Sequence, residues 1–460
     1  MLAVVPAVAS AHAGSIRGAT RRTLAIPVWL FLSTGGGVVG ASFLLASFAT
    51  DRAWIRTVHE YGRVLPAPGR IVRAAVRLFG VAALAATVVV GFVGPDTPFR
   101  NLAVLLVWVA FWTGYVATTY LVGDSWPAVN PFRTLADWLL AAADRLSLPV
   151  PSRSYPDRLG AWPGVAALLA LVWLEVTSPL ADEPRLLATL VAGYTLLTVA
   201  GAVLVGPDDW FARVDPIAKL LAYYGRVAPV ERTADGLRLR LPGAALYESR
   251  LVTGRDEVAF VVAVVFVTTF DGLVGTGPWA DVARAVVDLG VPPTVVYLAA
   301  YLGGYALFVG AFLLAAATAR RTAETFVSTD ELARRFAPSL LAIAAGYHLA
   351  HNLGAFLTLA PTLAAVLPNP IALGPLAGPP QNPPRLAGLP GWFGGLELAF
   401  VLLGHLVAVW VAHATAYELF PSRLQAIRSQ YGVTLAMVLY TMTSLAIVTA
   451  AYVPPPFVGG

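Results

Sequence analysis

Four of the six histidines fall in two strongly apolar segments in the last quarter of the chain. His348 and His351 are three residues apart, so a helix would place them on one face. His405 and His413 are eight residues apart, about 12 Å along a helix axis, which is too far for one ion to bind both. The depth of each histidine follows from its distance to the end of its segment, at about 1.5 Å per residue of helix. His348 and His405 then lie near the middle of a hydrocarbon layer about 30 Å thick, and His413 lies near its inner edge. Adjacent antiparallel helices could therefore bring His348, His351 and His405 together.

Three carboxylates, Glu175, Asp271 and Glu397, also lie within apolar segments. An ionisable group in hydrocarbon costs about 2.5–3.5 kcal/mol, so such side chains should face the interior of a bundle and find partners there. Imidazoles and carboxylates are suitable ligands for zinc or iron. We therefore predict a metal site with the three histidines as ligands. Asp271 would be a further ligand or the general base that activates a metal-bound water.

The composition identifies the solvent of these segments. Hydrophobic residues make up 58% of the chain and charged residues only 12%, with a mean hydropathy of +0.72. Soluble domains carry about 25% charged residues. Most of the surface must therefore face lipid, and the lipid bilayer is the expected partner. Cysteine is absent, which excludes disulfides and thiolate metal sites.

Ten stretches are long and apolar enough to be membrane spans. They cover residues 26–49, 77–94, 101–122, 162–178, 185–205, 257–276, 294–317, 338–360, 393–415 and 431–453. If the N-terminus lies outside, 24 of the 31 basic residues fall in inner segments. Because Lys and Arg are retained on the cytoplasmic side, this bias predicts an N-out, C-out protein of a prokaryotic cell membrane. The net charge of +5 then reflects topology, so nucleic acid is not an expected partner.

The segments outside the spans suggest a simple organisation. Residues 1–11 end in Ala9-Ser10-Ala11 and resemble a signal peptide. Cleavage there would expose His12, whose imidazole and free amine could chelate copper; a disordered outer tail is the alternative. We expect one transmembrane domain over residues 12–460. Its inner loop 206–256 should hold a small interfacial helix or hairpin, and its Pro-rich outer loop 361–392 should be extended.

The buried histidines leave two further interpretations open. They could serve only to hydrogen-bond helices together, as in a non-catalytic membrane subunit. They could also form the relay of a proton-coupled secondary transporter or permease. A transporter of inverted repeats would have broken helices at the glycines of the first span, 35–37 and 40, and at residues 268–277 of the sixth. The alternative for the first span is close helix packing through Gly36 and Gly40.

The chain resembles the actinobacterial and haloarchaeal membrane proteins described as fenitrothion hydrolase-like. Matching segments include Ala11-His12, residues 27–31, Asn130 to Leu135, Thr269 to Leu273, Ala350-His351, Gly404-His405 with Ala412-His413, and Arg428 to Tyr431. The resemblance implies metal-dependent hydrolysis of an organophosphate triester, and it points to Asp271, His351, His405 and His413. The sequence thus predicts an all-α, polytopic transmembrane bundle with a His/Asp site, whose activity is a hydrolase, a transporter or neither.

Overall fold

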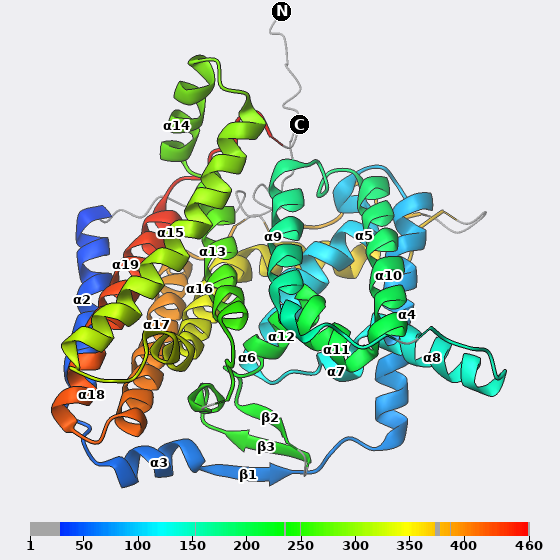
Figure 1. Ribbon diagram of the computed structural model, residues 1–460. Coiled ribbons are helices and arrows are strands. Elements are labelled where there is room, and N and C mark those ends of the chain that lie inside the picture. The colour runs from blue at the N-terminus through cyan, green and yellow to red at the C-terminus, as the bar shows by residue number, and fades with distance from the viewer. Residues whose placement is uncertain are drawn as a thin grey trace, which may run out of the picture.

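The computed structural model describes residues 28–458 apart from 152, 234–235, 249, 373–377 and 387. Its architecture is a bundle of long helices (Figure 1). Eight helices are long and apolar enough to cross a membrane, and two shorter apolar helices, α2 and α9, occupy the first and fourth predicted spans. The prediction of a helical membrane protein is therefore confirmed.

The helices follow the predicted order. The eight longer ones are α4 (Arg70–Val93), the composite helix of α5 (Leu102–Val104), η2 (Leu105–Tyr115) and α6 (Val116–Leu121), α10 (Pro184–Val205), α13 (Arg255–Val274), α15 (Pro293–Thr322), α16 (Thr329–Val366), α17 (Phe393–Leu419) and the pair of α18 (Arg423–Ser429) with α19 (Tyr431–Thr449). The two shorter ones are α2 (Val28–Ala46) and α9 (Trp162–Thr177). Connecting elements are α3 (Arg52–Glu60), α7 (Trp126–Val129), α8 (Pro131–Arg145), α11 (Pro207–Asp209), η4 (Trp210–Val214), α12 (Pro216–Tyr224), α14 (Gly277–Asp288) and the 3-10 turns η1 (Pro98–Arg100), η3 (Asp157–Leu159) and η5 (Ala244–Tyr247).

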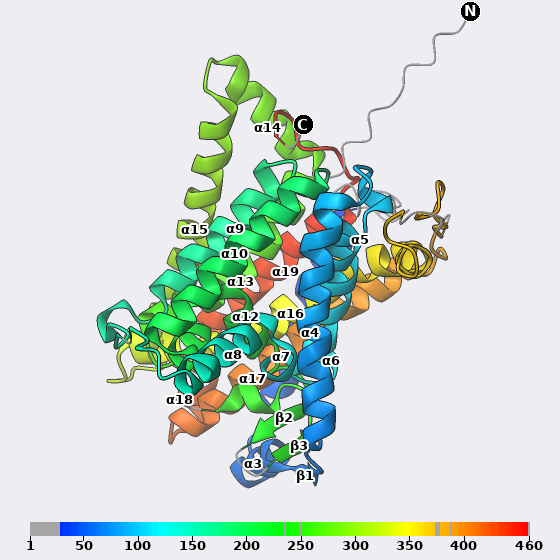
Figure 2. The same cartoon turned by 90° about the vertical axis from the view of Figure 1, so that its right-hand side faces the viewer.

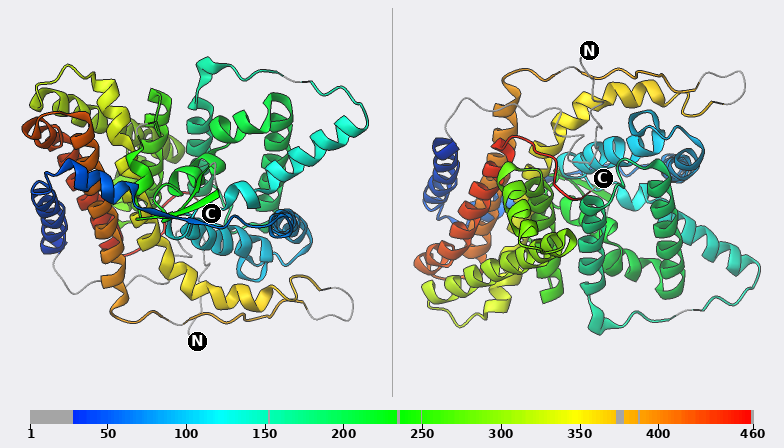
Figure 3. Two further views of the ribbon diagram at one scale, coloured as in Figure 1. Left: turned by 90° about the horizontal axis from the view of Figure 1, so that it is seen from below. Right: turned by 90° about the horizontal axis from the view of Figure 1, so that it is seen from above.

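Helix α16 is the centre of the packing, because it contacts α13, α15, α17 and η2. It has 38 residues, about 57 Å of helix, which exceeds a hydrocarbon layer of about 30 Å. Viewed along the bundle axis, its yellow outer part runs sideways (Figure 3). Tilting of this kind accommodates a helix that is longer than the bilayer is thick.

A three-stranded antiparallel sheet closes one end of the bundle, opposite α14 and the described C-terminal residues (Figures 1 and 2). Its order is β1 (Gly62–Leu65), β3 (Gly236–Arg240), β2 (Val230–Thr233), with Gly62 opposite Arg240. The β2–β3 hairpin comes from inner loop 206–256, and β1 comes from the loop between the first two spans. Both loops are predicted to lie on the inner side, so the sheet joins them into one inner cap.

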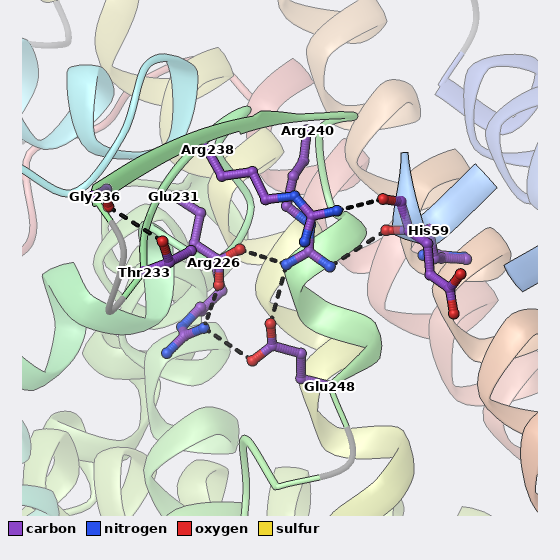
Figure 4. A network of polar contacts seen from close by, with 9 residues as sticks. His59, Arg226, Glu231, Thr233, Gly236, Arg238, Arg240 and Glu248 are labelled. Carbon is purple, nitrogen blue, oxygen red and sulfur yellow. Dashed lines mark hydrogen bonds and ion pairs between the residues drawn. The ribbon is translucent and has the colours of Figure 1, made fainter. Parts of the chain in front are cut away.

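Ion pairs between two arginines and two glutamates hold the inner cap together (Figure 4). Arg240 contacts Glu231 and Glu248, and Arg226 donates to the same two carboxylates at 2.8 and 3.1 Å. Arg240 also donates to the backbone carbonyl of His59 at 3.3 Å. The network therefore ties the hairpin to α3, a helix far away in the sequence.

The helices that could have been broken in the membrane are continuous. Helix α2 runs through its glycines, and α13 runs without interruption to Val274, so residues 268–277 mark its outer end instead of a gap. Thr268 and Thr269 donate their hydroxyls to carbonyls within the helix, which satisfies them locally. Gly35 and Gly36 pack on α19, whereas Gly40 meets no neighbour within 4 Å. The broken-helix hypothesis is wrong, and close packing uses the pair 35–36 instead of Gly36 and Gly40.

The Pro-rich segment 361–392 folds back on the outer end of α16. Thr362 still belongs to the helix, and its hydroxyl donates to the carbonyl of Pro384 at 2.7 Å. Arg100 donates to the carbonyl of Pro380 at 3.0 Å, and the guanidinium of Arg385 lies 3.9 Å from the ring centroid of Phe99. These contacts fasten the described parts of the loop to η1, beside the third span.

A polar cavity among α9, α13 and α16

Four of the predicted site residues line one small cavity. Its walls come from α9, α13, α16 and the π-helix η2 (Leu105–Tyr115), and its volume is about 20 Å³. A space of this size holds about one water molecule. The lining residues are Trp112, Val172, Glu175, Val267, Thr268, Asp271, Tyr347, His348, His351 and Asn352.

Two titratable side chains, His351 and Asp271, come close to each other in the cavity. Nε2 of His351 lies 3.7 Å from Oδ2 of Asp271, and their side chains are only 4% and 12% exposed. The ring of Tyr347 stacks on His351, with centroids 5.5 Å apart. A Cβ on Gly272 would overlap the Tyr347 hydroxyl and lie 2.6 Å from Cγ2 of Ile447. The glycine after Asp271 therefore lets α16 approach closely enough for the pair to form.

His348 lies in the same cavity with an aromatic shell. Its Nδ1 is 3.0 Å from the hydroxyl of Tyr120, and the rings of Trp112, Tyr120 and Tyr224 all contact it within 6 Å. The side chain is 1% exposed. Trp112 reaches His348 from a stretch of π-helix, a conformation that is frequent at functional sites.

His405 lies outside this cavity. It is fully buried in α17, its Nδ1 is 2.8 Å from the carbonyl of Val401 in the same helix, and its Nε2 has no hydrogen-bond partner. Among the residues that the structure describes, no three His, Asp or Glu side chains are arranged to hold a metal ion. The predicted ligand set of His348, His351 and His405 is therefore not formed. The spacing of three residues correctly placed the first two on one helix face, but the depth of His405 in its helix does not determine which way its side chain points.

The remaining candidates have different surroundings. Nε2 of His413 is 2.9 Å from the carbonyl of Ala49, and Nδ1 is 3.3 Å from Oε1 of Gln430, so this histidine links α17 to the segment after α2 and to the end of α18. Glu397 is half-buried in the first turns of α17 and does not line the cavity. His12 and the signal-peptide prediction for residues 1–11 lie outside the described residues.

Sequence reasoning missed the neutral polar residues of the site. Tyr120, Tyr347 and Asn352 carry no charge, so a search for ionisable groups at membrane depth passes over them. Asn352 donates to the carbonyl of His348 at 2.9 Å, while its Oδ1 is buried without a partner. Spacing could have found two of them, since Tyr347 and Asn352 directly flank the segment from His348 to His351.

Comparisons with family models, with curated proteins and with solved structures find no match to this chain. The likeness to fenitrothion hydrolase-like proteins therefore stays a prediction.

Proposed function

We propose that this protein is a proton-coupled transporter or permease of a prokaryotic cell membrane, of a kind without the broken helices of an inverted-repeat transporter, with Glu175, Asp271 and His351 as its proton-binding site. One observation carries the proposal: two carboxylates and two imidazoles line a single water-sized cavity in a bundle of lipid-embedded helices. Ionisable residues inside a membrane that face one cavity are typical of proton relays.

The charge of the cavity explains why it would bind protons. With both carboxylates ionised and both imidazoles neutral, the four groups carry two negative charges. Charge in a low-dielectric region is costly, so binding of protons by the cavity lowers this cost. Asp271 and His351 can share one proton as an ion pair or as a neutral pair. Glu175 is the second carboxylate of the cavity and offers a further proton acceptor.

Each side chain has a physical role in moving that proton. Imidazole has two nitrogens, so His351 can accept a proton at one and release it from the other. Its Nε2 is 3.7 Å from Asp271, longer than a direct hydrogen bond, and one water or a small torsion would close the gap. Tyr120 holds the ring of His348 in a fixed orientation through its hydroxyl.

The geometry supports the hydrolase interpretation less well. Pockets for organic ligands measure about 300–1,000 Å³, against about 20 Å³ here. A catalytic zinc site takes three protein ligands, and the described residues offer no such group. The described residues, as they are arranged, therefore do not fit a resident metal.

Infrared titration of the purified, reconstituted protein tests the proposal without knowledge of the substrate. We expect a protonated carboxyl band that disappears as the pH rises and that is lost in Asp271→Asn or Glu175→Gln. Glu397→Gln is the matched control, because Glu397 lies at membrane depth outside the cavity, and it should leave the band unchanged. Vesicles with an imposed pH gradient should then show uptake of a cargo from a compound screen, abolished in Asp271→Asn.

Two results would contradict the proposal. The first is a titration in which Asp271→Asn and Glu175→Gln leave every carboxyl band of the wild type in place. The second is stoichiometric zinc or iron in the purified protein that is lost in His351→Ala, which would restore the metal hypothesis.

A further inference from the structure

A second, larger cavity lies at the end of the bundle where the inner segments are predicted. It measures about 360 Å³ and is formed by the last turns of α15 and the first residue of α16. Its lining residues are Ala317, Arg320, Arg321, Glu324, Thr325, Phe326 and Thr329. This volume is in the range of ligand pockets, and nothing in the proton-binding site uses it.

The charge of this cavity is positive. Arg320 and Arg321 are exposed, and no ion pair joins either guanidinium to a carboxylate among the described residues. The one carboxylate that lines the cavity, Glu324, already lies 3.6 Å from Arg428. Two arginines therefore remain available for an anion from outside the chain.

An apolar stripe leads directly to these arginines. Leu307 and Leu314 are 69% and 65% exposed on α15, and Arg321 follows at the same spacing of seven residues, so the three lie on one face. Because α15 is a candidate membrane span, exposed leucines on it face lipid chains. Phe326, at the rim of the cavity, is fully exposed. The site is thus cationic at its inner end and apolar above it.

We propose that this cavity binds the anionic headgroup of one phospholipid of the inner leaflet. The phosphate would lie between Arg320 and Arg321, and one acyl chain would lie along Leu307 and Leu314. Guanidinium groups pair well with phosphate oxygens, and basic pockets between membrane helices on the cytoplasmic side bind phospholipid headgroups. The adjoining apolar stripe favours an amphiphile over a free phosphate.

Binding of a fluorescent phosphatidylglycerol to the full-length protein in mild detergent tests this site. Each arginine near an anionic headgroup contributes about a fivefold change in affinity, so Arg320→Gln with Arg321→Gln should weaken binding roughly 25-fold. The matched control is Arg153→Gln with Arg158→Gln, which removes the same charge from another inner loop and should change affinity less than about twofold. Arg320→Lys with Arg321→Lys should retain most of the binding, which shows that the fold is intact.

Three further arms separate the alternatives. Phosphatidylcholine should compete poorly, because the arginines act on net negative charge. Glycerol phosphate should compete only weakly, because it lacks the acyl chains; competition as strong as that of the lipid would overturn the lipid assignment. Equal losses in the Arg320/Arg321 and Arg153/Arg158 variants would also overturn it, since general electrostatic attraction to the inner side would then be sufficient.

Discussion

The crossing of α16 and α17 offers the sharpest test of the packing. Gly346 and Gly404 face each other there. A Cβ on Gly404 would lie 2.6 Å from the carbonyl oxygen of Ala342, and one on Gly346 would lie 2.6 Å from that of Phe400. Ordinary contacts of a Cβ begin at 3.4 Å. Each alanine substitution must therefore push the helices apart by about 0.8 Å, the difference between these two distances.

The expected destabilisation follows from two opposing effects. Overpacking of this kind costs about 1–3 kcal/mol, and replacing glycine by alanine in a helix returns up to about 1 kcal/mol. We expect Gly346→Ala and Gly404→Ala each to destabilise the protein by about 1–2 kcal/mol. The double variant should lose less than the sum, because one substitution already opens the gap that the other needs.

Unfolding in detergent, followed by circular dichroism with denaturant, measures these differences. Gly303→Ala and Gly310→Ala are matched controls, since a Cβ at either position on α15 meets nothing within 4 Å. Both controls should be neutral or slightly stabilising. The reasoning fails if Gly404→Ala is as stable as the controls, or if the losses of the two crossing variants add fully.

Two other predictions concern titratable groups on the predicted inner side. Burial lowers the pKa of His59 to about 4 from its usual 6.5, so the unfolded chain takes up its proton first and stability falls between about pH 6.5 and pH 4. The loss should reach about 3 kcal/mol and be absent in His59→Phe, and unfolding measured across this pH range checks it; an unchanged pH profile in the variant would refute the assignment. Lys219 and Glu257 form an ion pair at 3.2 Å, and their side chains are only 7% and 21% exposed. Lys219→Met alone should lower the free energy of unfolding by about 3 kcal/mol, because it leaves the Glu257 carboxylate without its cationic partner. Adding Glu257→Met should recover most of that loss in the same unfolding assay, and no recovery would mean that the lysine stabilises the fold by packing alone.

The spans were predictable because hydropathy and the arginine bias are one-dimensional properties of a chain. The ends of the helices were harder to predict. Helix α16 begins at Thr329, nine residues before the predicted span. The prediction began too late because Arg334 and Arg335 lower the local hydropathy without ending the helix. Arg335 instead pairs with Glu418 at 3.0 Å. Charged residues at the inner boundary thus hide helix that continues beyond the membrane.

The site was predictable in the same partial way. Depth alone grouped Glu175, Asp271, His348 and His351, because similar heights in antiparallel helices are a condition for meeting. It also admitted His405 and Glu397, which lie on α17 outside the cavity, because depth leaves the rotational position of a side chain on its helix undetermined. That rotation depends on where α16 and α17 cross, and the crossing depends on the Gly346–Gly404 contact, which has no signature in hydropathy.

The inner sheet has a consequence for how the protein is made. Strand β1 leaves the ribosome long before its partner: Glu60 and Arg238, which are hydrogen-bonded in the finished cap, are 178 residues apart. At synthesis rates of about 5–20 residues per second, this interval lasts roughly 10–35 seconds. During that time β1 has an open edge while four further spans are inserted. The inner cap can therefore form only if the spans of the first half of the chain are inserted in the correct orientation. A single misinserted span would leave β1 and β3 on opposite sides of the membrane.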